Sequence, residues 1–504
     1  MKTLVIAEKP SVARDIARVL GCAKKENGAL EGNQYIVTWA LGHLVTLKDP
    51  EDYDKKYKEW NMAVLPMMPE KLQIKVIPQT GKQYHAVTTQ LARKDVGEVV
   101  IATDAGREGE LVARWILDKA HNQKPCKRLW ISSVTDKAIR EGFASLKDAK
   151  EYDNLYRAAV SRAEADWLVG INATRALTCK YNAQLSCGRV QTPTLAMIAQ
   201  REQEIREFVP KPYYTVTAAA GGAVYTWKDE KSGGTRISDP EKAKQIAEKA
   251  KRYPLVLQKV EKKKKQKEAP LLYDLTELQR DASARFGYSA KQTLNLMQSL
   301  YETHKVLTYP RTDSRYLTKD IVPTLKERLD AVSIGPYKTL AQQAKRRPLK
   351  EKPGFVNDAK VSDHHAIIPT EQYVQLSALS NEERRIYDLV VRRFLAVLLP
   401  PCVYEETVIQ ASIEKECFTA RGKRMVEKGW QEAYEDNRYD DEDEAKEEVR
   451  EQNLPLLQAG MKFDQSRSAS GRERQSRRHA LRKERCFPRW RIRSVTWKTA
   501  TAVL

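Results

Sequence analysis

The chain has 504 residues, 41% of them hydrophobic, and a formal net charge of +21. Residues 465–504 supply +10 of this charge, so the rest of the chain is only moderately basic and permits a polyanionic partner without demanding one. Because the sequence has no run of about 18 apolar residues and no signal peptide, we expect a soluble cytoplasmic protein of roughly three or four domains.

Residues 1–150 alternate between strand-like and helix-like patterns. The apolar run 3–7 is followed by an amphipathic stretch that stops at Gly21. Residues 98–103 repeat this order before a second helix, and residues 128–133 have the composition of a third strand. Alternation of this kind is typical of a parallel α/β domain.

The chain changes character after this first domain. Residues 151–205 are predicted to be helical around the loop 182–194, and residues 211–265 are predicted to be rich in strands. The lysine-rich stretch 261–270 is predicted to be a surface connection.

The second half begins with helices and then returns to strands. Residues 275–399 are predicted to be mostly helical, including a helix that begins with a capping box at Ser289. Strand-like patterns return at 403–413 and 428–434, and the acidic stretch 435–452 is predicted to be a solvated loop. The segments that we expect are 1–150, 151–210, 211–270, 271–398, 399–464 and 465–504.

Acidic residues follow two of the predicted parallel strands. Glu8 and Asp104 each come directly after a strand, and Glu108 lies one helical turn further. Loops at the carboxyl ends of parallel strands form the ligand site of open α/β sheets, and carboxylates suit a hard cation such as Mg²⁺. The alternative is that Asp104 only caps a helix and Glu108 only favours its N-terminal dipole. Lys9 is a candidate general acid or phosphate contact, or simply a solvated lysine.

A tyrosine and an arginine stand close together in the segment 307–314. Tyr309 precedes a proline and is therefore held extended, so that Arg311, two residues on, shares its side of the chain. The two side chains can meet one phosphate, and tyrosine can act as a covalent nucleophile. The alternative, an ordinary buried tyrosine in a proline-bounded loop, is the commoner situation.

A further polar loop contains His364 and His365. Adjacent residues cannot easily face one site together, so we expect one of this pair to be structural. The sequence contains no phosphate-binding GxxxxGK[ST] loop, which gives no sign of an ATP-driven reaction.

Several segments, taken together and in this order, resemble the type IA DNA topoisomerases. The matching segments extend from the N-terminus to about residue 460 with the family's spacing. They are VIAEKPSVAR, LGHLV, IATDAGREGE, RLWISS, RAEADWLVGINATRAL, SCGRVQTPTL, LYDLTELQRDA, TYPRTDS and DHHAIIPT. The resemblance implies a multidomain fold of the α/β plus α+β class, with an N-terminal Toprim domain followed by a toroidal core around a hole that admits DNA.

The resemblance also implies an activity. Tyr309 would attack one DNA strand, form a 5′-phosphotyrosine link and release a 3′-hydroxyl, which reverses the attack after another strand has passed. The substrate would be single-stranded or negatively supercoiled DNA at the nucleoid. Neither ATP nor a membrane would take part, and we expect a monomer.

Roles for individual residues follow from the same resemblance. Glu8, Asp104 and Glu108 would hold Mg²⁺. Lys9 would protonate the leaving oxygen or stabilise its charge. Arg311 would clamp the scissile phosphate, and His364 matches the family's active-site histidine. Gly106 stands where many relatives have a further aspartate, which leaves ligands for one ion. The expected DNA contacts are Trp60, Trp167, Arg175, Ser186, Gly188, Arg189, Gln191, Thr192 and Arg311.

The C-terminal region departs from the family's pattern. A proline-rich segment that should follow residue 460 is absent, yet a shifted reading of the codons for residues 474–493 can encode a peptide of that kind. We therefore hypothesise a frameshift between about residues 462 and 470. On this hypothesis residues 465–504 form an aberrant, disordered tail, and the core is incomplete at its C-terminus. The alternative function is then a DNA-binding remnant that cannot complete strand passage.

Overall fold

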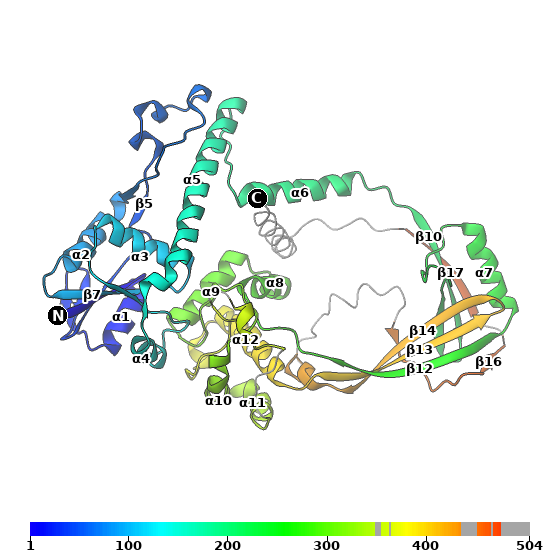
Figure 1. The fold of residues 1–504 in the computed structure, drawn as a ribbon. Coiled ribbons are helices and arrows are strands. Elements are labelled where there is room, and N and C mark those ends of the chain that lie inside the picture. Colours follow the sequence, from blue (N-terminus) through cyan, green and yellow to red (C-terminus); the bar gives the residue numbers. More distant parts are fainter. Residues whose placement is uncertain (348–353, 362–363, 435–450, 465–466, 475–504) are drawn as a thin grey trace.

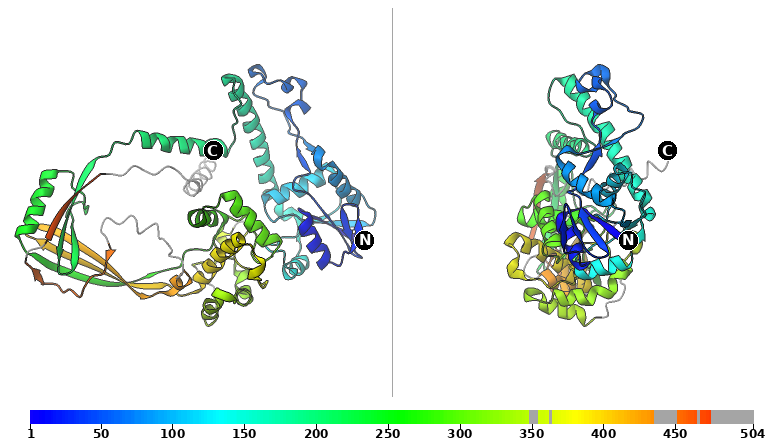
Figure 2. Two further views of the ribbon diagram at one scale, coloured as in Figure 1. Left: turned by 180° about the vertical axis from the view of Figure 1, so that it is seen from behind. Right: turned by 90° about the vertical axis from the view of Figure 1, so that its left-hand side faces the viewer.

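The computed structural model describes residues 1–347, 354–361, 364–434, 451–464 and 467–474. The described residues form four groups of elements that follow a ring-shaped course (Figure 1). An α/β domain begins the chain, two helices lead away from it, a β-rich domain follows, and long strands return to a helical domain beside the first. Figure 2 shows the same course from behind and edge-on. The predicted α/β domain and ring-like multidomain core are thus confirmed, although the sheet of the α/β domain is parallel only in its central strands and antiparallel at both edges.

The α/β domain is built on a sheet of strand order β2-β3-β4-β1-β7-β8-β9. Strand β1 (Lys2–Ala7) pairs in parallel with β4 (Tyr35–Trp39) and β7 (Val96–Ala102). Successive side chains of β1 enter two hydrophobic cores, one on each face of the sheet, as a strand's twofold alternation requires. The other strands are β2 (Lys24–Glu26), β3 (Ala29–Glu31), β8 (Cys126–Arg128) and β9 (Lys147–Asp148), and β5 (Val45–Leu47) pairs separately with β6 (Ile74–Val76).

Helices cover both faces of this sheet. α1 (Pro10–Val19) contributes its apolar side to one core. α2 (Gly81–Leu91) and α3 (Arg107–Lys119) contribute to the other. α4 (Asp136–Ala144) follows β8. β8 ends at Arg128, so the strand predicted over 128–133 is wrong beyond its first residue.

The two helices that leave the α/β domain are α5 (Asp153–Tyr181) and α6 (Gln191–Arg206). We call them the α5–α6 arm. The predicted helices are confirmed, although the loop between them is shorter than expected because α6 already begins at Gln191. The side chains buried along the arm are Ala159, Trp167, Arg175, Met197 and Arg201.

The β-rich domain has the strand order β16-β12-β13-β14-β11-β10-β17, with β15 beside β14. Its strands are β10 (Pro212–Ala220), β11 (Ala223–Trp227), β12 (Leu255–Lys267), β13 (Cys402–Ile413), β14 (Glu416–Glu427), β15 (Glu451–Gln452), β16 (Lys462–Phe463) and β17 (Arg467–Arg474). Helix α7 (Pro240–Arg252), which the sequence analysis missed, shares its hydrophobic core.

Two predictions about this domain are wrong. Most of the lysine-rich stretch 261–270 is not a connection, because β12 extends to Lys267 and pairs with β13. Residues 467–474 are not disordered, because β17 pairs with β10 in antiparallel register. Both strands are held by main-chain hydrogen bonds, which do not require an apolar side-chain pattern. Residues 475–504, for which the shifted reading of the codons was mainly proposed, lie outside the described residues. The same holds for residues 435–450 of the predicted acidic loop.

The helical domain contains α8 (Leu275–Phe286), α9 (Ala290–Glu302), α10 (Leu325–Ala331), α11 (Lys338–Lys345) and α12 (Asn381–Leu398). As predicted, Ser289 caps α9, with its hydroxyl accepting from the backbone N–H of Gln292 at 3.1 Å. The segment 428–434 is not a strand but mainly a 3₁₀ helix that buries Trp430 against this domain. In the described part of the chain, no helix is both long and apolar enough to cross a lipid bilayer.

Candidate active site

A cleft of about 860 Å³ lies where the α/β domain, the helical domain and the base of α5 meet. The predicted catalytic and metal-binding residues all line it, although they come from distant parts of the sequence: Glu8, Lys9, Asp104, Glu108, Tyr309, Arg311 and His364. The ring-like course of the chain therefore brings the helical domain's tyrosine loop to the carboxyl ends of the parallel strands, as expected.

The tyrosine loop is fixed by contacts on several sides. The backbone N–H of Tyr309 donates to the carbonyl of Ser132 at 2.9 Å, across the boundary between the two domains. Its ring lies edge-on to Tyr301 and 4.4 Å, centroid to centroid, from His364. The phenol is 3.5 Å from a carboxylate oxygen of Asp104. Tyr309 is buried, but it faces a polar cleft, unlike an ordinary core tyrosine.

The environment of Tyr309 keeps its phenol protonated in the absence of substrate. Burial raises the pKa of Tyr309, and the nearby carboxylates of Asp104 and Glu8 raise it further, whereas Arg311 acts in the opposite direction. Added positive charge in the cleft would therefore favour the reactive phenolate.

Glu8 and Asp104 form a carboxylate pair at the ends of β1 and β7. The Glu8 carboxylate accepts from the backbone N–H of Asp104 at 3.1 Å. Burial, and then the charge of Asp104, raises the pKa of Glu8 to about 7. The side chain of Asp104 does not cap α3, whose N-cap is Gly106. The alternative reading of Asp104 as a helix cap is thus wrong.

Lys9 is held between two carboxylates rather than solvated. Its ammonium lies 2.6 Å from Glu302 and 3.4 Å from Asp104. Burial lowers the pKa of Lys9, but the charges of Asp104 and Glu302 outweigh this effect and leave it raised. Lys9 is therefore a stable cation that points at the site from the α/β domain while Glu302 holds it from the helical domain.

Glu108 lies apart from the carboxylate pair. Its carboxylate is 3.0 Å from Arg162 and 3.8 Å from His43, and these two side chains lower its pKa. Among the described residues, no group of three or more His, Cys, Asp or Glu side chains is placed to hold a metal ion. The two neighbouring carboxylates of Glu8 and Asp104, whose charge Lys9 offsets only in part, nevertheless fit a hard cation, which would relieve the raised pKa of Glu8.

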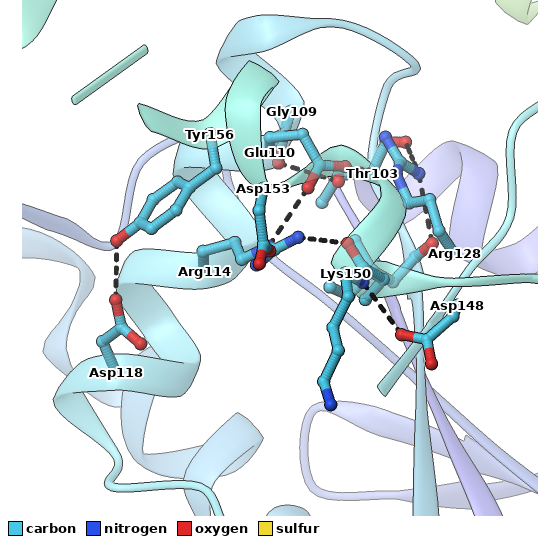
Figure 3. A network of polar contacts seen from close by, with 12 residues as sticks. Thr103, Gly109, Glu110, Arg114, Asp118, Arg128, Asp148, Lys150, Asp153 and Tyr156 are labelled. Atoms are coloured by element: carbon cyan, nitrogen blue, oxygen red, sulfur yellow. Dashed lines mark hydrogen bonds and ion pairs between the residues drawn. The ribbon is translucent and has the colours of Figure 1, made fainter. Parts of the chain in front are cut away.

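A buried polar network supports the loop that carries Asp104 (Figure 3). Arg128 is fully buried and donates to Glu110 at 2.5 Å and to the carbonyl of Asp104 at 2.8 Å. Thr103 donates to the carbonyl of Gly109 at 2.8 Å. A β-carbon on Gly109 would stand 1.9 Å from the carbonyl oxygen of Asp104, so the close approach of α3 to this loop requires glycine.

The same network reaches the base of α5. Arg114 donates to Glu110 at 3.2 Å and to Asp153 at 2.7 Å, and Tyr156 donates to Asp118 at 2.6 Å. In Figure 3 these side chains connect α3 with the start of α5. The loop that carries Asp104 and the base of α5 are thus held together on this side of the cleft.

Of the residues expected to contact DNA, four lie on or beside α5, two of them exposed and two buried. Arg189, on the loop before α6, pairs with Asp166 of the cleft lining at 2.6 Å, and Trp60 is half exposed. Trp167 is buried and donates to the carbonyl of Lys48 at 2.9 Å. Arg175 is buried too and donates to the carbonyl of Tyr57, with its guanidinium over the Trp60 ring.

The remaining expected contacts lie where α5 and α6 join. The hydroxyl of Thr192 accepts from the backbone N–H of Gly188 at 3.1 Å. Ser186 and Gln191 are in the same loop and first helical turn. The structure does not place these residues in the lining of the cleft.

Some residues of the site were missed by the sequence analysis. Glu302 holds Lys9, His43 and Arg162 hold Glu108, and Ser132 contacts both Tyr309 and His364. His43, Ser132 and Arg162 lie within segments that match the family, which was the only signal available, and Glu302 lies in none of them. His365 is buried and its Nδ1 is 2.7 Å from the carbonyl of Ala366, so one histidine of the pair is structural, as expected.

Comparisons with known proteins agree with this geometry. Residues 150–479 match the DNA topoisomerase family, and residues 3–134 match the Toprim domain. Full-length topoisomerase I from Thermotoga maritima has a similar fold, with a TM-score of 0.71 and 21% identity over 96% of this chain and 74% of that one. The chain belongs to the type IA DNA topoisomerase family.

Within this family, the relatives that it resembles strongly are named DNA topoisomerase 3. The proteins of that name from Bacillus subtilis and Bacillus anthracis are each 60% identical to it, over 459 and 460 residues. These matches cover 91% of this chain and 63% of each relative. The chain thus spans less than two thirds of the length of these relatives.

Proposed function

We propose that this protein changes the topology of DNA by cutting one strand through a transient covalent bond to Tyr309, letting another strand pass and rejoining the first. The main support for the proposal is the position of Tyr309. Its phenol lies against Asp104 in a cleft that is lined by residues of two domains. Membership of the type IA family supports it.

The proposed reaction is a reversible exchange of phosphate esters. The Tyr309 oxygen attacks the scissile phosphorus and loses its proton, the bond from phosphorus to the 3′-oxygen breaks, and the 3′-oxygen takes up one proton, so that no proton is gained or lost in the exchange. The products are a 5′-phosphotyrosine and a 3′-hydroxyl, and the reverse attack restores the strand. Because one phosphodiester is exchanged for another, no ATP is required.

The residues around Tyr309 would divide the work. Arg311 would bind the phosphate and stabilise its charge. Lys9, whose raised pKa makes it a weak proton donor, would stabilise the negative charge on the leaving 3′-oxygen. Glu8 and Asp104 would hold Mg²⁺, which when bound supplies positive charge that positions the 3′-hydroxyl for rejoining. Glu108 would join them only by leaving Arg162.

The DNA strand would follow the basic and aromatic side chains between the cleft and the arm. Arg189 and Trp60 are exposed enough to meet phosphates and bases directly, and the loop residues Ser186, Gly188, Gln191 and Thr192 would contact the backbone. Arg175 and Trp167 would act indirectly, by holding the segment that carries Trp60. We propose negatively supercoiled or single-stranded DNA as the substrate, a monomeric protein, and the nucleoid as its location.

The proposal is tested by trapping the covalent link. The wild-type chain, mixed with a single-stranded oligonucleotide and quenched with detergent, should give a protein–DNA adduct on a denaturing gel. Tyr309→Phe should remove the adduct completely while leaving DNA affinity unchanged. Tyr301→Phe, which changes the neighbouring buried tyrosine, should keep it.

Two results would contradict the proposal. An adduct that persists in Tyr309→Phe would show that another residue is the nucleophile. A wild-type chain that binds DNA without any adduct would favour the alternative of a DNA-binding protein that cannot transfer strands. Relaxation of negatively supercoiled plasmid without ATP would then measure strand passage itself.

A further inference from the structure

Ser132 contacts two residues of the tyrosine-bearing domain from the opposite side of the domain boundary. Its carbonyl accepts from the backbone N–H of Tyr309 at 2.9 Å, and its hydroxyl lies 3.1 Å from Nδ1 of His364. Ser132 belongs to the segment after β8, where the strand has ended and the backbone is free to bond across the boundary. One residue thus touches both the nucleophile's loop and the histidine of the cleft.

The ring of His364 packs against two aromatic rings. It is stacked on Trp130, with 5.9 Å between the ring centroids and 12° between the ring planes. The corresponding values for its contact with Tyr309 are 4.4 Å and 37°. Its carbonyl accepts from the hydroxyl of Thr312 at 2.8 Å. The two ring contacts hold the imidazole in the orientation in which Nδ1 faces Ser132.

The two nitrogens of His364 have different environments. Nδ1 is occupied by Ser132, whereas Nε2 is buried and has no hydrogen-bond partner within the described residues, although His364 lines the cleft. Burial lowers the pKa of His364 to about 3, so the ring is neutral and carries a single N–H. Which nitrogen carries that proton decides whether the free edge donates or accepts.

We propose that Ser132 is a positioning residue whose hydroxyl donates to Nδ1 of His364 and thereby keeps the proton on Nε2, aimed at an oxygen of the scissile phosphate. The opposite tautomer would present the Nε2 lone pair to an anion and would leave the Ser132 hydroxyl without an acceptor in the described residues. The role toward phosphate rests on the proposed function, whereas the tautomer is a property of the DNA-free protein.

The proposal also links chemistry to closure of the two domains. Both contacts of Ser132 cross the boundary, so separation of the domains releases the Tyr309 backbone and the His364 tautomer together. Cleavage and rejoining would then be favoured only in the closed form, so the covalent link would be neither formed nor reversed while the domains are apart.

The first test measures the tautomer without DNA. Histidine labelled with ¹⁵N in the full chain should show a protonated Nε2 and an unprotonated Nδ1 for His364, identified by the signal that disappears in His364→Gln. Ser132→Ala should change this pattern, and Ser132→Thr, which keeps the hydroxyl, should preserve it. Ser133→Ala is the matched control, since its hydroxyl accepts from the backbone N–H of Thr135 at 3.3 Å and does not contact His364.

The second test measures the reaction. Ser132→Ala should slow single-turnover cleavage by about 10-fold or more while leaving oligonucleotide affinity unchanged, and Ser132→Thr should recover the rate. A wild-type His364 protonated on Nδ1, or a Ser132→Ala chain with unaltered tautomer and rate, would overturn the proposal. If the wild type forms no adduct, the proposed function fails, but the ¹⁵N pattern still decides the role of Ser132.

Discussion

The boundary between the Toprim domain and the helical domain, which we call the Toprim–tyrosine boundary, differs from the α5–α6 arm in how its residues are held. Across the boundary, Lys9 pairs with Glu302, Asp15 pairs with Lys305 at 2.6 Å, and Tyr309 and Tyr301 enter a hydrophobic core of the Toprim domain. Along the arm, large apolar side chains remain exposed, with Leu195 at 66% and Val169 at 51%.

This difference shows that the two regions are stabilised by different interactions. α6 contains good helix formers and local pairs such as Arg201 with Glu204 at 3.1 Å, which stabilise this helix in addition to the burial of Met197. The boundary contains few local signals, and its residues are ordered by packing and by buried charges. Changes at the boundary should therefore cost more than equivalent changes in the arm.

The largest difference is expected for two arginine–carboxylate pairs. Arg128→Met removes the fully buried partner of the fully buried Glu110, which keeps only the longer contact with Arg114, and should lower the free energy of unfolding by about 3–5 kcal/mol. Arg189→Met breaks the exposed pair with Asp166 and should cost about 0.2–1 kcal/mol. Urea unfolding measures both. Similar losses in the two variants would contradict the comparison, and a second change, Glu110→Leu, should restore part of the loss in Arg128→Met.

A matched pair of leucines separates packing from helix formation. Leu300 in α9 is fully buried, so Leu300→Ala should cost about 2–5 kcal/mol. Leu195 in α6 is mostly exposed, so Leu195→Ala should change the free energy of unfolding by less than about 0.5 kcal/mol. Thermal unfolding followed by circular dichroism distinguishes them. A large loss in Leu195→Ala would show that the face of α6 that carries Leu195 is packed in solution.

The most specific effect is the response to pH. The pKa of Glu8 is raised to about 7 from 4.5, so between these values the folded protein holds a proton that the unfolded chain lacks. Stability should therefore fall as pH rises through this window, and Mg²⁺ should reduce the fall. Glu8→Gln should flatten the profile and remove the effect of Mg²⁺ in a pH series of thermal unfolding.

The arm provides the opposite case for this prediction. Arg189 lowers the pKa of Asp166, so stability from this pair should be present at neutral pH and be lost as pH falls below the ordinary aspartate value. Asp166→Asn should change only that acidic part of the profile.

A Glu8→Gln profile identical to that of the wild type above pH 4.5 would show that Glu8 is not held in a buried carboxylate pair.

The sequence alone predicted the elements whose order is local. Strands β1 and β7, helices α1 and α3 and the cap at Ser289 follow from periodicity and capping residues, and the parallel domain follows from their alternation. The sequence alone did not predict the strands that are held mainly by backbone pairing. The lysines of β12 and the arginines of β17 have no apolar alternation, and their strands form because β13 and β10 lie beside them.

The candidate site shows the same division. Glu8, Asp104, Tyr309 and Arg311 could be selected from the sequence, because each stands in a recognisable turn or extended segment and because the family shares the motifs. Their meeting in one cleft could not be derived from spacing, since it depends on a ring-shaped course that returns residue 309 to residue 104. Glu302 and Ser132 acquire roles only through that return. Local sequence determined which chemical groups this protein carries, and tertiary structure decided which of them act together, because contacts across a domain boundary leave no period in the sequence.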